Sequence, residues 1–149
     1  MCGFVICFND KKIQNKLNIY KKNKINFFNH RGPDNSKFYS DQSISILFNR
    51  LSIIDLSQKS NQPFISKNKR FVLVFNGEIY NYKDLSNEIK NKGFKFESDG
   101  EAEVLIKGFE IFGESFINKV RGMFAICLWD KKKNSLLTFR DRFGQKPLY

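Results

Sequence analysis

The sequence predicts a single domain of the α+β class, a layered sandwich of sheets and helices. Short runs of apolar and β-branched residues come in groups, and segments with helical spacing of apolar residues interrupt those groups. This mixed order favours an α+β sandwich over a regular alternation of strands and helices. With 149 residues, no repeat and no internal linker, the chain fits one domain that buries roughly 70% of its extended surface.

The first half of the chain predicts strands separated by one helix. The apolar run from Gly3 to Phe8 is long enough for a buried strand and too short for a helix. Apolar residues at helical spacing predict a helix over Lys12 to Asn29, which ends at a Gly-Pro pair. Further strands are predicted over Ser43–Ile54 and Phe71–Phe75, the second broken at Asn76–Gly77 and resumed at Ile79.

The second half predicts two helices and a terminal hairpin. One helix follows Asn81 as its N-cap and has Tyr82, Leu85 and Ile89 on one face, with Gly93 as its stop. The remaining elements are a brief strand over Phe94–Glu97, a helix over Glu103–Phe112, and strands over Met123–Trp129 and Ser135–Arg140 joined by the polar loop Asp130–Asn134.

Composition argues against several classes of partner. The net charge of +11 raises nucleic-acid binding as a hypothesis, yet the lysines are dispersed and the longest run is only Lys131–Lys133. No stretch approaches the ~20 apolar residues of a membrane span, and no signal peptide is visible. The three cysteines lack metal-ligand spacing. We therefore expect no nucleic-acid or membrane partner, no metal site, and a reducing, cytoplasmic setting.

Cys2 is the strongest candidate nucleophile. Removal of the initiator methionine would place its thiol and a free α-amine on the same residue. That amine has a reference pKa of about 7.7–8.0, so it can accept the thiol proton at neutral pH without a histidine partner. Taken alone, Cys2 is better explained as a chance residue in a frayed terminus. The apolar run that follows Gly3 favours an ordered terminus, whereas Cys7 and Cys127 lie within apolar runs and are expected to be core thiols.

Two further positions suit acyl-transfer chemistry. Asn76 and Gly77 follow a predicted buried strand, where a side-chain amide and a backbone N–H could both point at a developing oxyanion. The alternative for this pair is an ordinary Asn-Gly hairpin turn. Arg50 follows a β-rich run, and its guanidinium suits bidentate capture of a carboxylate. Its alternative is a surface arginine paired with a nearby acid.

Together these segments resemble the glutaminase domain of glutamine-hydrolysing asparagine synthases, a class II glutamine amidotransferase. The similarity runs in order along the whole chain. It rests on the segments Met1–Gly3, His30–Asp34 (HRGPD), Arg50–Asp55 (RLSIID), Asn76–Asn81 (NGEIYN), Gly122–Ala125 (GMFA) and Arg140–Gly144 (RDRFG).

The resemblance implies a fold and a set of roles. The fold is the four-layer αββα sandwich of the N-terminal-nucleophile hydrolases. It implies that Cys2 is the nucleophile, that its α-amine is the base, and that Asn76 and Gly77 form the oxyanion hole. Arg50 would bind the glutamine α-carboxylate. The rest of the implied glutamine pocket is Leu51, Ser52, Ile53, Ile54 and Glu78.

The chain departs from the family at the site for the glutamine amino group. The family has an aspartate in an Asp-Thr-Glu-Val-like segment there. Alignment of Glu103–Val104 with this segment places Glu101 at the aspartate, and Asp99 two residues upstream is the alternative.

A second departure concerns the synthetase domain of the family, which binds ATP through a Ser-Gly-Gly-x-Asp-Ser loop. That loop is absent from the sequence, so we expect no cofactor in this chain, with ATP and Mg²⁺ needed only by a synthetase domain or subunit that accepts the ammonia. The sequence also allows a homodimer. A non-catalytic domain of the same fold that binds glutamine or a partner is the competing hypothesis.

Overall fold

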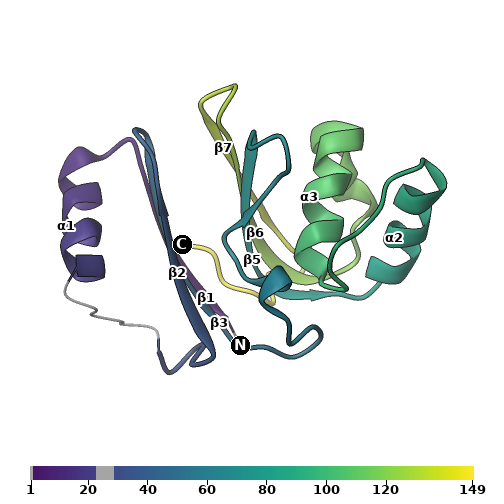
Figure 1. Ribbon diagram of the computed structural model, residues 1–149, viewed down its shortest axis with the longest axis horizontal. Coiled ribbons are helices and arrows are strands. Elements are labelled where there is room, and N and C mark those ends of the chain that lie inside the picture. Colours follow the sequence, from purple (N-terminus) through teal and green to yellow (C-terminus); the bar gives the residue numbers. More distant parts are fainter. Residues whose placement is uncertain (1, 23–28) are drawn as a thin grey trace.

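The computed structural model describes residues 2–22 and 29–149, and these form four layers in the order helix, sheet, sheet, helices (Figure 1). The first sheet has the order β1-β3-β2 and the second the order β4-β5-β6-β7, and all pairs are antiparallel. The strands are β1 (Gly3–Phe8), β2 (Asn35–Ser40), β3 (Ile44–Arg50), β4 (Phe64–Ile65), β5 (Phe71–Ile79), β6 (Gly122–Asp130) and β7 (Ser135–Arg140).

Helices cover the outer faces of both sheets. Helix α1 (Lys11–Lys22) lies outside the first sheet, and α2 (Tyr82–Asn91) and α3 (Glu101–Phe112) lie outside the second (Figure 1). Short 3₁₀ helices, η1 (Gln58–Ser60) and η2 (Gly113–Lys119), complete the fold. The predicted α+β class and αββα sandwich are thus confirmed.

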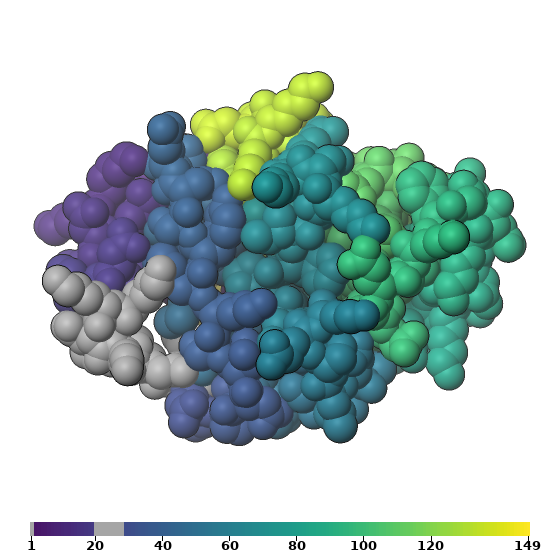
Figure 2. Space-filling view, in the orientation of Figure 1, coloured from purple at the N-terminus to yellow at the C-terminus, as the bar shows by residue number. Residues whose placement is uncertain are grey.

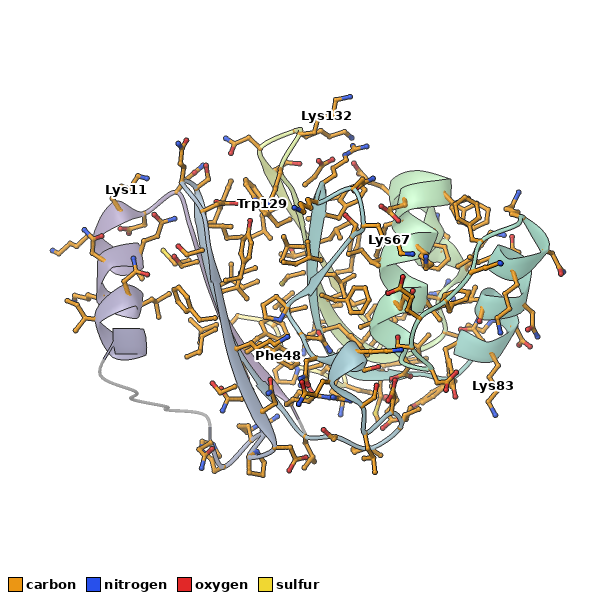
Figure 3. The ribbon with its side chains drawn as sticks, in the orientation of Figure 1. Lys11, Phe48, Lys67, Lys83, Trp129 and Lys132 are labelled. Atoms are coloured by element: carbon orange, nitrogen blue, oxygen red, sulfur yellow. The ribbon has the colours of Figure 1, made fainter. Side chains whose placement is uncertain are left out.

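Strand alternation divides the interior into two cores. In β5, Phe71, Leu73 and Phe75 pack against the helices, whereas Val72 and Val74 face the other sheet. Phe48 and Trp129 fill the space between the sheets, where Figure 3 shows both side chains. The even-numbered residues of β5 therefore face β1, and Asn76 is one of them.

The strand predicted to break at Asn76–Gly77 is continuous, so that prediction was wrong. Strand β5 pairs with β6 without interruption as far as Ile79 opposite Gly122. A Cβ added to Gly77 would lie 2.0 Å from the carbonyl oxygen of Met123, and one added to Gly122 would lie 2.1 Å from that of Glu78. Two glycines thus let the backbones approach closely, and pairing with β6 overrides the turn preference of Asn-Gly.

Other boundaries also differ from the predictions. The segment Phe94–Glu97 is not a strand, because the carboxylate of Glu103 accepts the backbone N–H groups of Glu97 and Ser98. Helix α3 begins at Glu101, two residues before the predicted start. The side chain of Asn81 makes no cap bond, since its amide binds the backbone at Lys119 and Arg121.

The remaining differences lie in the first half. Helix α1 covers Lys11–Lys22, and residues 23–28 of the predicted helix lie outside the described residues. Strand β2 has a polar sequence and was not predicted, and the strand predicted over Ser43–Ile54 ends at Arg50. Strands β1 and β7 have the predicted bounds.

Exposed lysines project from separate parts of the surface. Lys11, Lys83 and Lys132 come from α1, α2 and the β6–β7 turn and lie at different edges of the molecule (Figure 3). None of the helices in the described part of the chain is long and apolar enough to cross a membrane.

Candidate active site

Cys2 directly precedes β1 and lies between the two sheets. Its side chain packs with those of Phe4 and Ile6 against the inter-sheet core, as strand alternation requires. The backbone N–H of Leu51 donates to Cys2 Sγ at 3.4 Å, and Sγ lies 3.6 Å from the Leu51 carbonyl oxygen. The half-buried thiol is therefore held in the first sheet at the end of β3.

Asn76 faces the same space from the second sheet. It shares the parity of Val72 and Val74, so its side chain points from β5 toward β1, and it is 7% exposed. Asn76, Gly77 and Glu78 all line one cavity with Cys2. Asn76 and Gly77 are held in position by the long-range antiparallel pairing of β5 with β6, and they do not form a hairpin turn.

Arg50 ends β3 and reaches into the loop that follows. Its Nη1 donates to the carbonyl oxygen of Ser57 and to Asn61 Oδ1, each at 2.8 Å, and its Nη2 donates to the carbonyl oxygen of Asp55. Of the five guanidinium N–H groups, at most two are left for a substrate, which suffices for a bidentate carboxylate. Loop 51–61 thus fixes the orientation of a guanidinium that is 7% exposed.

The segment His30–Asp34 braces this region. The backbone N–H of Asp34 donates to the carbonyl oxygen of Arg50 at 3.1 Å, and Asp34 Oδ2 accepts the N–H of Ser52 at 2.7 Å. A Cβ on Gly32 would lie 2.5 Å from the carbonyl carbon of Asn49, so only glycine fits against β3 here. Leu51, Ile53 and Ile54 line the cavity, whereas Ser52 lies beside it, facing Asp34.

The two candidates for the amino-group site, Glu101 and Asp99, lie in different cavities. Glu101, at the start of α3, is 8% exposed and lines the cavity of Cys2, and its Oε1 accepts the N–H of Ile79 at 2.6 Å. Burial, and to a smaller degree the neighbouring charge of Glu78, raises the pKa of Glu101 to about 7, against the opposing hydrogen bond from Ile79. Asp99 is exposed and lines a different cavity, beside Lys83 and Lys90 of α2.

The shared cavity has a volume of about 80 Å³ and combines residues from both sheets, loop 51–62 and α3. In Figure 2 the blue-to-teal residues that connect the sheets fill the lower middle of the face, between the first sheet and the green α3 region. Sequence reasoning did not assign a role to several lining residues, namely Asp55, Ser60, Gln62, Gly100 and Ala102. Gln62 holds β5 in place, since its Oε1 accepts the N–H of Phe75 at 2.6 Å.

A second, larger cavity of about 780 Å³ meets the first at Cys2 and Asn76. It runs between β1 and the C-terminal residues and is lined mainly by apolar side chains, among them Phe4, Ile6 and Leu148. The thiol therefore lies where a small cavity of mixed lining and a large, mainly apolar one join.

The other two cysteines have the character of core residues. Cys7 and Cys127 are 6% and 3% exposed, and burial raises the pKa of both thiols, that of Cys127 to about 12. Within residues 2–22 and 29–149, no group of three or more His, Cys, Asp or Glu side chains is placed to hold a metal ion.

Two facing antiparallel sheets between helical layers, with a cysteine directly before β1 and an asparagine on the facing strand of the other sheet, give the αββα sandwich fold of the N-terminal-nucleophile hydrolases. A solved structure supports this fold: glutamine phosphoribosylpyrophosphate amidotransferase from Bacillus subtilis aligns with a TM-score of 0.55 and 18% identity over 67% of this chain and 24% of that chain.

The particular family follows from the sequence. The chain belongs to the glutamine amidotransferase domain family, whose model matches residues 1–149. It is 38% identical to asparagine synthetase [glutamine-hydrolyzing] 1 of Bacillus subtilis over its whole length and 43% identical to asparagine synthetase [glutamine-hydrolyzing] 2 of the same organism over 80% of it. These alignments span 24% and 16% of the two relatives, so the chain corresponds to a quarter or less of their length.

Proposed function

We propose that this domain hydrolyses the side-chain amide of glutamine, with Cys2 as nucleophile. The observation that carries the proposal is the convergence of Cys2, Arg50, Asn76, Gly77 and Glu101 on one cavity from separate segments of the chain. A nucleophile, oxyanion donors, a cation and a carboxylate are the groups that cleavage of an amino-acid amide requires.

The proposed reaction has two halves. The α-amine of Cys2 takes the thiol proton, and Sγ attacks the amide carbon of glutamine. Asn76 Nδ2–H and the Gly77 N–H donate to the resulting oxyanion. The ammonium of Cys2 returns its proton to the leaving nitrogen, ammonia departs, and a γ-glutamyl thioester remains. Water activated by the same amine then hydrolyses the thioester to glutamate and frees the thiol.

Two opposite charges would orient the substrate. Arg50 offers a cation to the glutamine α-carboxylate, and Glu101 offers a carboxylate to the α-ammonium. Both side chains are held by backbone partners before any substrate binds, Arg50 by loop 51–61 and Glu101 by Ile79. This preorganisation lowers the entropic cost of binding.

The activity of a longer protein is part of the proposal. The relatives that the chain matches are named asparagine synthetases, and their length leaves room for a further domain. We infer that the ammonia passes to a synthetase domain or subunit, which would bring its own ATP and Mg²⁺, in the cytoplasm. A homodimer is compatible with this arrangement.

The test is ammonia release from glutamine by the purified chain, measured beside two cysteine variants. Cys2→Ala should abolish release and leave the fold intact, because only a half-exposed thiol is removed. Cys7→Ser is the matched control, since a hydroxyl can replace the thiol that lies 3.3 Å from the Asp10 carbonyl oxygen. Equal activity in Cys2→Ala would point to another nucleophile, and glutamine binding without turnover in the wild type would indicate a non-catalytic domain.

A further inference from the structure

Asp55, a carboxylate in the cavity wall, has no role in the proposed reaction. It joins two segments that lie 44 residues apart in the sequence. Within its own loop, Oδ1 accepts the N–H of Ser57 at 2.7 Å and Oδ2 accepts the hydroxyl of Ser60 at 2.5 Å. Across the cavity edge, Oδ2 also accepts the N–H of Asp99 at 3.2 Å.

The two segments joined by Asp55 adjoin Arg50 and Glu101, the two charged groups proposed to orient the substrate. Loop 51–61 receives three hydrogen bonds from the guanidinium of Arg50, one of them at the carbonyl oxygen of Asp55 itself. Asp99 and Gly100 directly precede Glu101, the first residue of α3. The carboxylate of Asp55 therefore links the loop that holds Arg50 to the segment that precedes Glu101.

The same two segments also pack closely against each other at Gly100. A Cβ added to Gly100 would lie 2.2 Å from Ser60 Oγ and 2.9 Å from Ser60 Cβ. Ser60 and Gly100 are both buried, so the loop and the start of α3 touch without an intervening side chain. Burial opposes ionisation of Asp55, but its hydrogen bonds from Ser60, Ser57 and Asp99 outweigh burial and lower its pKa to about 2.

We propose that Asp55 is a positioning residue that sets the separation between Arg50 and Glu101 and thereby the affinity and selectivity for an α-amino acid substrate. The inference rests on the proposed function. A substrate with both an α-carboxylate and an α-ammonium must meet both charges at once, so a change in their separation weakens binding. Cys2 precedes β1, and Asn76 and Gly77 belong to β5. The hydrogen bonds of the Asp55 carboxylate go to Ser57, Ser60 and Asp99 instead, so we expect the chemical step to stay largely intact.

The variant Asp55→Asn tests this role. An amide of the same size offers one acceptor oxygen instead of two, so it loses the bond to Ser57 or the bond to Asp99. Glutamine KM should rise about 10-fold while kcat stays within about 2-fold, the pattern of lost substrate binding rather than lost transition-state stabilisation. Gly100→Ala, which forces the two segments apart but keeps the carboxylate, should produce the same pattern.

Asp41→Asn is the matched control. Asp41 also accepts several bonds, from Ser43, Ile44, Tyr39 and Trp129. It follows β2 at the end opposite Arg50, about 20 Å away at a rise of about 3.3 Å per residue. This variant should lower thermal stability without changing KM. A KM shift of equal size in Asp41→Asn, or an unchanged KM in Asp55→Asn, would overturn the inference.

Calorimetric titration of glutamine in a Cys2→Ala background separates this inference from the proposed function. If the wild type releases no ammonia but Asp55→Asn weakens glutamine binding, the proposed function fails and the positioning role stands. If turnover is present and Asp55→Asn binds glutamine as tightly as its parent, the positioning role fails alone. Absence of glutamine binding in both proteins would overturn the two together.

Discussion

Replacement of Glu101 by glutamine removes the negative charge proposed to face the substrate ammonium and changes little else. A glutamine side chain keeps an oxygen that can accept the Ile79 N–H, so the end of β5 retains its anchor. A hydrogen bond to a charged group contributes about 1.5–3 kcal/mol, and about 1.4 kcal/mol corresponds to a tenfold change. Glutamine KM should therefore rise about 10- to 150-fold in Glu101→Gln.

The pH dependence of KM gives this prediction a second signature. Because burial raises the pKa of Glu101 to about 7, the carboxylate is charged above that pH and protonated below it. Wild-type KM should level off only well above pH 7, where the carboxylate is fully charged, and rise as the pH falls through 7, whereas KM of Glu101→Gln should show no such rise.

Steady-state ammonia release across this pH range is the assay, and Asp99→Asn is the control. Asp99 is exposed and lines another cavity, so its variant should keep the wild-type KM. A large KM change in Asp99→Asn with none in Glu101→Gln would refute the reasoning and assign the amino-group site to Asp99.

Three further outcomes are expected. Glu101→Gln should raise the melting temperature at pH 8 and much less at pH 4. The folded-state pKa of Glu101 is raised to about 7 from its ordinary 4.5, so ionisation of this carboxyl lowers the stability of the fold once the pH passes 4.5, and the loss is complete above pH 7. Differential scanning calorimetry at both pH values checks this. Asn76→Ala should lower kcat by about 10²–10³ with a much smaller change in KM, as for loss of one oxyanion donor, and a normal kcat would remove Asn76 from the chemistry. Gly77→Ala should lower both kcat and the melting temperature, since its Cβ would lie 2.0 Å from the Met123 carbonyl oxygen, and unchanged values would show that β5 and β6 separate freely there.

The elements that could be predicted from the sequence are those with a strong local signal. The apolar run of β1 and the spacing of Leu85 and Ile89 in α2 each describe a buried face by themselves. Strand β2 was missed because its residues Asn35 to Ser40 are mostly polar, and only pairing with β3 makes them a strand. The strand break predicted at Asn76–Gly77 was wrong for the same reason, because pairing with a strand nearly 50 positions later decides the backbone there.

In the candidate site too, some residues have a local sequence signal and others depend on long-range contacts. Cys2, Arg50, Asn76 and Glu101 are chemically distinctive or lie in recognisable motifs, and the structure brings all four to one cavity. Asp55 lies within a motif too, yet its bond to the backbone at Asp99 joins segments whose proximity no local pattern reveals. Roles that depend on long-range hydrogen bonds therefore emerged only with the fold.

The central claim is that Cys2 is an N-terminal nucleophile that carries the glutamyl group. Intact-mass spectrometry of the chain, acid-quenched during turnover with glutamine, tests it most directly. We expect a chain that begins at Cys2 and a fraction with the added mass of one γ-glutamyl group, which fragmentation of the N-terminal peptide places on Cys2 and not on Cys7. A fully active chain that retains Met1, or a glutamyl adduct on Cys7 or Cys127, would contradict it.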